Sequence, residues 1–257
     1  DFNTLNFGGR REDGTTPYRL GDQDLSLFFG QSSFSQYVVT RASNAVVVDP
    51  EVDLTLLGPL GCGIQTGSGT VLNRLKPVVG ESLVVFGCGA GGLSAIMAAK
   101  LTGCSQIIAV DIHASRLALA RELGATHQIN GKEQDAVAVI KQITGKGAHY
   151  AVETTGVSAI VLQAVHAVKP LGTVAIVGFT GDITLNVQND LMAEGKSLVG
   201  VIEGDAVPAL FIPLLVQLYK QGKFPIDKLI ARYPLADINQ AFADSASGKV
   251  IKPVVVM

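Results

Sequence analysis

The sequence has few charged residues and no apolar segment long enough to cross a membrane. Charged residues make up 16% of the 257, against about 25% in a typical soluble protein. The mean hydropathy is +0.36, yet the most apolar stretch, 206–216, contains Pro208 and Pro213 and falls short of the ~20 residues that a bilayer requires. We therefore expect a soluble globular protein whose apolar character comes from elements buried on both faces.

The sequence also lacks the charge pattern of a nucleic-acid binder and the cysteine pattern of a disulfide-stabilised protein. The net charge is −2, and the 20 basic and 22 acidic residues are scattered along the chain, without a basic stripe. Three irregularly spaced cysteines do not make a disulfide framework. We expect a cytoplasmic protein with neither nucleic acid nor membrane among its partners.

What the sequence does contain is an alternation of apolar β-like runs and helical patterns. The runs at 83–86 and 106–110 are short and continuously apolar, as in parallel strands buried between two layers of helices. Further strands and helices are predicted at 150–153, 173–177, 135–144 and 158–168. The alternation predicts an α/β fold with a doubly wound parallel sheet. Outside it, β-like runs lie at 35–40, 45–48 and 253–257.

A glycine-rich turn follows the first predicted strand. Gly87, Gly89 and Gly92 fit the pattern G-x-G-x-x-G. In this pattern the first glycine allows a tight turn, the second lets a pyrophosphate approach the backbone, and the third lets helix and strand pack closely. The N-terminus of the next helix offers free N–H groups to the phosphates. Because glycine-rich turns are common, the motif alone is weak evidence.

An acidic residue stands at the spacing that a ribose-binding carboxylate requires. Asp111 ends the second predicted strand, 19 residues after Gly92 (111 − 92), close to the ~20 typical of dinucleotide-binding folds. A carboxylate there accepts hydrogen bonds from both ribose hydroxyls and repels a 2′-phosphate, which favours NAD over NADP. The alternative is that Asp111 only caps the helix that follows. Arg116 is placed either to reach the adenosine or to lie in solvent.

Longer segments resemble the zinc-dependent alcohol dehydrogenases of the medium-chain dehydrogenase/reductase superfamily. The likeness covers almost the whole chain, through 61–67, 84–94, 109–112, 123–126, 153–156, 176–178, 247–249 and 252–253. The aryl-alcohol (benzyl alcohol) dehydrogenase branch is the most similar at 58–67, 211–213 and 221–225. The resemblance implies a Rossmann-type NAD-binding domain over 63–202. It also implies that 1–62 and 203–257 belong to a GroES-like catalytic domain.

The resemblance further implies roles for single residues. Cys62 matches a ligand of the catalytic zinc, Thr66 a residue beside the nicotinamide, and Phe34 an aromatic wall of the substrate pocket. The other matched positions surround NAD, and they are Gly87, Gly89, Ala90, Gly91, Gly92, Asp111, Arg116, Thr155, Val177, Phe179, Ile202, Glu203 and Lys252.

The activity implied by the resemblance is the reversible, zinc- and NAD-dependent oxidation of a primary alcohol to the aldehyde by hydride transfer. An aromatic alcohol is the expected substrate. The resemblance also implies a homodimer or homotetramer, joined through an edge strand near 184–187.

The sequence departs from the family in its metal ligands. A catalytic zinc keeps three protein ligands and one open position. The family segment with the other two ligands, the proton-relay hydroxyl and the structural-zinc cysteines has no counterpart in these 257 residues. The histidines at 113, 127, 149 and 166 are not spaced to join Cys62, and we expect them, with Cys88 and Cys104, to be surface or packing residues. We expect the 257 residues alone to bind NAD without turnover.

Two other functions stay open at this point. A zinc-free enzyme similar to quinone reductases is one, although such enzymes usually bind NADPH and lack the ligand cysteine, so Cys62 and Asp111 argue against it. The other is a non-catalytic NAD-binding module.

Overall fold

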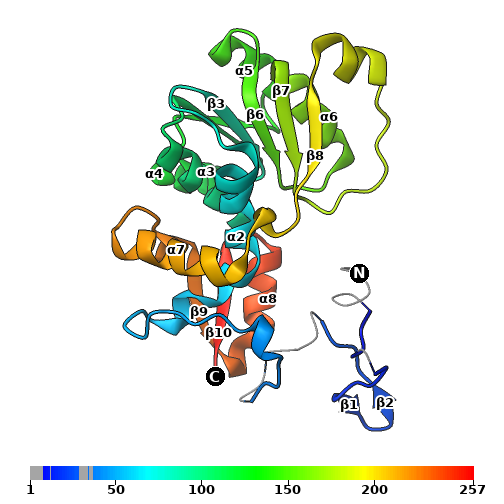
Figure 1. Ribbon diagram of the computed structural model, residues 1–257, viewed down its shortest axis with the longest axis vertical. Helices are drawn as coiled ribbons and strands as arrows, with labels where there is room; N and C mark the ends of the chain where they lie inside the picture. The colour runs from blue at the N-terminus through cyan, green and yellow to red at the C-terminus, as the bar shows by residue number, and fades with distance from the viewer. Residues whose placement is uncertain (1–7, 12, 29–33, 35–36) are drawn as a thin grey trace.

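The computed structural model describes residues 8–11, 13–28, 34 and 37–257, which form two lobes (Figure 1). One lobe is built around a six-stranded sheet with helices on its faces. The other holds two helices and a two-stranded sheet from the C-terminal part of the chain. Helix α2 (Gly63–Gly69) lies where the two lobes meet.

The large sheet is parallel throughout, with the strand order β5-β4-β3-β6-β7-β8. Counted within the sheet this is 3-2-1-4-5-6, the Rossmann order, so the predicted doubly wound fold is confirmed. The order reverses between β3 and β6, and ligands of such sheets bind beyond the carboxyl ends of the strands at that point. The strands are β3 (Ser82–Phe86), β4 (Gln106–Asp111), β5 (His127–Asn130), β6 (Ala148–Glu153), β7 (Val168–Ile176) and β8 (Ser197–Gly200).

The continuous apolar run of β3 is explained by burial on both faces of the sheet. Leu83 and Val85 belong to one buried cluster, and Val84 and Phe86 belong to another. Burial of each such side chain contributes roughly 1.5–3 kcal/mol. The first cluster includes α3 (Ala90–Thr102) and α4 (Ala114–Leu123), and the second includes α5 (Ala136–Thr144) and α6 (Ser158–Ala167).

The C-terminal part of the chain builds the second lobe. Helix α7 (Pro208–Lys220) begins with a proline, which is well suited to the first helical turn because it has no N–H to satisfy. Strands β9 (Ile230–Pro234) and β10 (Lys252–Val256) pair in parallel, and α8 (Ile238–Ala246) connects them. The predicted terminal strand is therefore present, one residue earlier than expected.

The β-like runs before residue 62 do not form strands. Residues 45–48 and 37–40 are irregular, and 35–36 lie outside the described residues. The described part of this region contains only the two-residue strands β1 (Arg19–Leu20) and β2 (Gln23–Asp24), with short 3₁₀ turns at Ala42–Asn44, Leu54–Leu56 and Gly58–Gly61. A strand needs a hydrogen-bonded neighbour, and no described residue pairs with these runs.

The predicted edge strand near 184–187 is also wrong, because the edge strands of the sheet are β5 and β8 and residues 184–187 form no strand. The Asn186 side chain accepts a hydrogen bond from the backbone N–H of Asn189 at 3.1 Å. This bond caps the N-terminus of a π-helical turn at Val187–Leu191, and no residue of 184–187 is in a strand.

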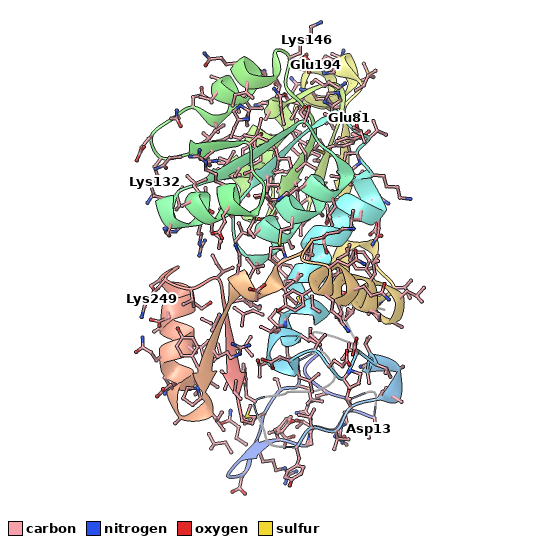
Figure 2. All side chains as sticks on the ribbon, turned by 90° about the vertical axis from the view of Figure 1, so that its left-hand side faces the viewer. Asp13, Glu81, Lys132, Lys146, Glu194 and Lys249 are labelled. Atoms are coloured by element: carbon pink, nitrogen blue, oxygen red, sulfur yellow. The ribbon has the colours of Figure 1, made fainter. Side chains whose placement is uncertain are left out.

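Several charged side chains lie at the outer surface of the molecule. Figure 2 shows Lys132, Lys146 and Glu194 at the periphery of the sheet lobe and Lys249 on the outside of the second lobe. No helix within the described ranges has both the length and the apolar character needed to cross a membrane. The low content of charged residues is thus accounted for by a sheet that is buried on both faces.

Candidate active site

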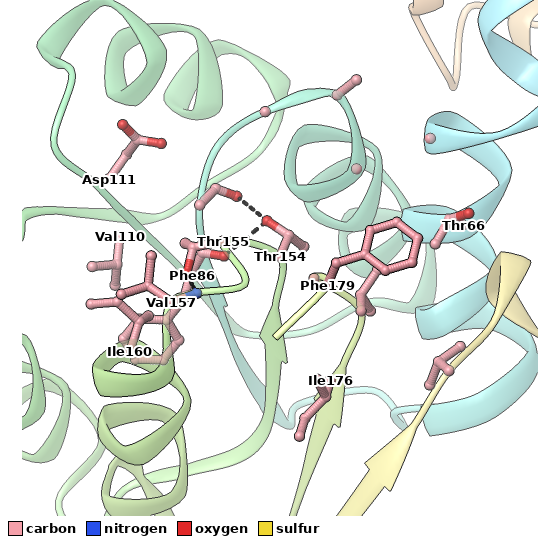
Figure 3. Close-up of a pocket in the computed structure, with 18 of the residues that line it drawn as sticks. Thr66, Phe86, Val110, Asp111, Thr154, Thr155, Val157, Ile160, Ile176 and Phe179 are labelled. Carbon is pink, nitrogen blue, oxygen red and sulfur yellow. Dashed lines mark hydrogen bonds between the residues drawn. The ribbon is translucent and has the colours of Figure 1, made fainter. Parts of the chain in front are cut away.

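A cavity of about 1120 Å³ lies beyond the carboxyl ends of the sheet strands. In Figure 3, Asp111 lies at one end of this cavity and Thr66 of α2 at the other, with Thr154, Thr155 and Phe179 between them. The cavity brings together most of the residues predicted from the sequence, namely Cys62, Thr66, Gly87, Gly89, Ala90, Gly91, Asp111, Arg116, Thr155, Val177, Phe179, Ile202 and Glu203.

The three motif glycines serve different geometric needs. Gly87 has φ +89°, and a Cβ there would lie 2.6 Å from the hydroxyl of Thr154. A Cβ on Gly92 would lie 1.8 Å from the carbonyl oxygen of Gly87, so only glycine fits. A Cβ on Gly89 would meet no atom within 4 Å. The first and third glycines therefore make the turn possible, while Gly89 leaves open space at the start of α3.

The carboxylate of Asp111 is fixed by backbone donors. It is 7% exposed and accepts hydrogen bonds from the N–H groups of Cys88 (2.7 Å), Ile112 (2.7 Å) and His113 (2.8 Å). None of these donors belongs to α4, so Asp111 does not act as the cap of that helix. A carboxylate has about four acceptor positions, which leaves capacity for a ribose hydroxyl in the cavity.

Arg116 and His113 flank Asp111 on the wall of the cavity. The Nε of Arg116 is buried and has no hydrogen-bond partner among the described residues. A buried polar group without a partner is costly. The guanidinium lies against the backbone of Gly248, where a Cβ would be 3.1 Å from Nη2. This end of the cavity thus carries the acceptor Asp111 and the cationic side chain of Arg116 on its wall, which fits a nucleoside with ribose hydroxyls and ring acceptors.

The opposite end of the cavity holds Cys62, Thr66 and Glu203. The carboxylate of Glu203 accepts a hydrogen bond from the hydroxyl of Thr66 at 3.2 Å and lies 3.9 Å from the Cys62 thiol. Burial raises the pKa of the Cys62 thiol, and the Glu203 carboxylate raises it further, against a smaller opposing effect of Lys252.

Three predicted site residues do not line the cavity. Gly92 lies behind the turn, against Gly87. Lys252 begins β10 and is close enough to influence Cys62. Phe34 packs edge-on against Phe242, with ring centroids 5.9 Å apart, and the phenylalanines on the cavity wall are Phe28, Phe86 and Phe179.

Other lining residues were missed by sequence reasoning. Val157 and Ile160 start helix α6 after the β6 turn, and Gln163 follows them at helical spacing. These residues follow β6, the strand beside which the order of the sheet reverses. That position is the signal that identifies them as residues of a ligand cavity.

The remaining histidines and cysteines lie outside the cavity or are packed. His149 Nδ1 lies 2.8 Å from the Ser82 hydroxyl, and His166 Nε2 lies 3.1 Å from the Asp190 carboxylate. Cys88 is fully buried, and burial strongly raises the pKa of its thiol. Among the residues that the structure describes, no three or more His, Cys, Asp or Glu side chains are grouped to hold a metal ion.

A Rossmann sheet with such a cavity at its switch point has the architecture that dinucleotide-binding domains of dehydrogenases share. The family model described as "Zinc-binding dehydrogenase" matches residues 91–220. The chain belongs to this family, and its fold is that of the medium-chain alcohol dehydrogenases.

Similar proteins carry the names of alcohol dehydrogenases. Geraniol dehydrogenase of Castellaniella defragrans is 43% identical over 98% of this chain and 69% of its own length. Benzyl alcohol dehydrogenase of Acinetobacter calcoaceticus matches with TM-score 0.91 and 48% identity over 99% of this chain and 70% of that chain. An alcohol dehydrogenase zinc-binding domain protein of Burkholderia ambifaria matches with TM-score 0.94 and 50% identity. The match covers 100% of this chain and 70% of that chain.

Proposed function

We propose that the chain is the cofactor-binding part of an NAD-dependent dehydrogenase that reversibly oxidises a primary, aromatic alcohol to the aldehyde. The supporting observation is that one cavity joins the Asp111 end to the end that holds Cys62 and Thr66. The names of two relatives, a benzyl alcohol dehydrogenase and a geraniol dehydrogenase, support a primary alcohol next to an unsaturated carbon.

The residues at the Asp111 end fit the adenosine half of NAD. Asp111 offers acceptor positions to the ribose hydroxyls, and its negative charge disfavours a 2′-phosphate. The open space over Gly89 and the free N–H groups at the start of α3 suit the pyrophosphate. The guanidinium group of Arg116 lies on the wall at the same end.

At the other end, Val177, Phe179 and Ile202 form a mainly apolar wall beside Thr66. Bound NAD supplies the hydride acceptor. The apolar side chains would exclude water from the reacting carbon, and the wall would hold the alcohol against the nicotinamide.

The described residues do not complete a catalytic zinc site. Such a site takes three protein ligands, and Cys62 has no two partners of ligand type grouped with it. We propose Cys62 as one zinc ligand and propose that residues outside these 257 supply the others, which agrees with a coverage of 69–70% of the relatives' lengths.

Titration and metal analysis test the proposal. The 257-residue chain is expected to bind NADH more tightly than NADPH, to hold no stoichiometric zinc and to form no NADH from benzyl alcohol. Tighter binding of NADPH would favour the enzyme similar to quinone reductases, and turnover by these residues alone would contradict the zinc proposal.

A cysteine substitution tests the role of Cys62 in the longer, active protein. Cys62→Ala is expected to abolish benzyl alcohol oxidation and leave the Kd for NADH unchanged. Cys104→Ala is the matched control, because this cysteine does not line the cavity. This variant should keep both the oxidation of benzyl alcohol and the Kd for NADH. Equal loss of NADH binding and turnover in Cys62→Ala would overturn the assignment.

A further inference from the structure

Three consecutive residues after β8 adopt a left-handed backbone conformation. Glu203, Gly204 and Asp205 have φ values of +49°, +69° and +48°. Residues other than glycine rarely adopt such angles, because Cβ crowds the backbone. We name Glu203–Asp205 the clasp. Strain of this kind persists only where surrounding contacts hold it.

Each clasp residue contacts the same helical segment, α2 and the π-helical turn Thr70–Leu75 that continues it. The Gly204 carbonyl accepts a hydrogen bond from the Asn73 amide at 3.0 Å. Asp205 forms an ion pair with Arg74 at 3.3 Å. A Cβ on Gly204 would lie 2.4 Å from the Gln65 carbonyl oxygen, so the close approach requires glycine.

Glu203 makes the contacts that reach the cavity. One carboxylate oxygen accepts hydrogen bonds from the Gln65 amide at 3.1 Å and from the Thr66 hydroxyl at 3.2 Å, while the other lies 3.9 Å from the Cys62 thiol. The Gln65 side chain is 2% exposed and also donates to the Gly61 carbonyl at 3.0 Å. The carboxylate thus joins the first turn of α2 to the end of β8.

The bond to Glu203 also fixes what Thr66 presents to the cavity. A threonine hydroxyl has one proton to donate and two lone pairs to accept. Since its proton is directed to Glu203, the Thr66 oxygen is left as an acceptor, which suits an amide N–H of a ligand.

We propose that Glu203 is a positioning residue, whose side chain holds Thr66 and the first turn of α2 in place as the wall of the nicotinamide end of the cavity. This inference rests on the proposed function, because it requires that the cavity binds NADH. Glu203 acts through Thr66 and Gln65, and the adenosine end of the cavity is independent of it.

The test uses the fluorescence of bound NADH, which reports the surroundings of the dihydronicotinamide ring. The chain contains no tryptophan, so the signal comes from NADH itself. Glu203→Ala is expected to lose at least about half of the fluorescence enhancement, while the Kd for ADP-ribose, which lacks the nicotinamide, stays within about twofold of the wild-type value. Glu203→Gln keeps an acceptor for Thr66 and should restore the enhancement.

Two further variants make the result decisive. Thr66→Val removes the hydroxyl that donates to Glu203, so it should show the same loss of NADH fluorescence enhancement as Glu203→Ala. It therefore tests the inference independently if Glu203→Ala folds poorly. Glu194→Ala, a glutamate paired with Lys196 outside the cavity, should behave as wild type.

The outcomes separate the inference from the proposed function. Unchanged NADH fluorescence in Glu203→Ala and Thr66→Val would overturn the inference alone. A parallel loss of ADP-ribose binding would also overturn it, because the effect would then be general to the fold. If the wild-type chain binds neither ADP-ribose nor NADH, the proposed function fails, and this inference fails with it.

Discussion

The sheet lobe and the region before residue 62 use similar apolar β-like runs with opposite results. In β3 every residue is buried, and Leu83–Phe86 pair with a strand on either side. In the earlier region, Val39 and Val47 are exposed to 78% and 91%, and no described strand covers them. An apolar run becomes a strand only where neighbours supply both hydrogen bonds and burial. Four predictions test this difference between the sheet lobe, where apolar runs find neighbouring strands, and the parts of the chain outside it.

The largest effect is expected from a methyl group added inside the sheet lobe. Gly92→Ala places a Cβ 1.8 Å from the Gly87 carbonyl oxygen, so the turn must move, at a cost of at least about 3 kcal/mol. Chemical denaturation should show this loss. Gly89→Ala is the control, since its Cβ meets nothing. It should fold normally but bind NADH more weakly, and a folded Gly92→Ala with unchanged stability would contradict the packing argument.

The next effect concerns the acid at the end of β4. Asp111→Asn removes the charge and one acceptor from a group that serves three backbone donors, so NADH affinity should fall by about 1–3 kcal/mol. Discrimination against NADPH should shrink as well. Titration with both cofactors measures this. Asp135, which caps α5 by accepting from the Ala138 N–H at 3.1 Å, is the control, and Asp135→Asn should leave both affinities unchanged.

A smaller, pH-dependent effect is expected in the second lobe. Asp244 accepts hydrogen bonds from Tyr233 (2.7 Å), Gln240 (2.7 Å) and Lys249 (3.0 Å). The Tyr233 hydroxyl, followed by Lys249, lowers the pKa of the Asp244 carboxyl below its ordinary 3.8. The folded pKa lies below the unfolded one, so this stabilisation is present above pH 3.8 and is lost as the pH falls further.

Asp244→Asn should therefore lower the thermal midpoint at pH 7 by on the order of 5 °C. The gap between wild type and variant should narrow toward pH 3, and a gap that widens on acidification would show that the sign is wrong. Gln240→Ala removes a donor and leaves the charge, so its effect should vary less with pH.

The smallest effect concerns a contact that ties the early region to the second lobe. Arg232 of β9 donates to Asp53 at 2.8 Å and to Thr55 at 2.6 Å. Both partners of the ion pair are about half exposed, so Arg232→Ala should lower the thermal midpoint by no more than about 3 °C. The shift should shrink in 1 M salt. A loss of stability as large as that expected for Gly92→Ala would mean that the region before residue 62 stabilises the whole fold.

The sheet lobe was largely predictable because its signals are local. The apolar runs of β3 and β4, the glycines and Asp111 lie within 30 residues of one another (82–111), and each constrains the next. Strands β5 and β8 were missed, because His127–Asn130 is not an apolar run and Ser197–Gly200 is an edge strand with little burial. Helix α8 was missed as well.

The predicted site divides in the same way. The residues of the glycine turn and Asp111 follow from spacing, whereas the expected place of Phe34 on the cavity wall does not, because Phe34 packs against Phe242 in the tertiary structure. The expected strand at 184–187 failed because the Asn186 side chain satisfies a backbone N–H locally and starts a turn. No sequence pattern placed the Glu203 side chain beside Thr66, 137 residues away.

The sequence by itself determined the Rossmann sheet, the glycine turn and the position of Asp111 at the end of β4, because their geometry depends on short-range spacing and on burial from both faces. Only the tertiary structure decided that the clasp folds onto α2, that the Cys88 N–H donates to Asp111, and that Phe34 lies against Phe242 instead of lining the cavity. These features depend on contacts between segments far apart in the chain, and such contacts leave no periodic signal in the sequence.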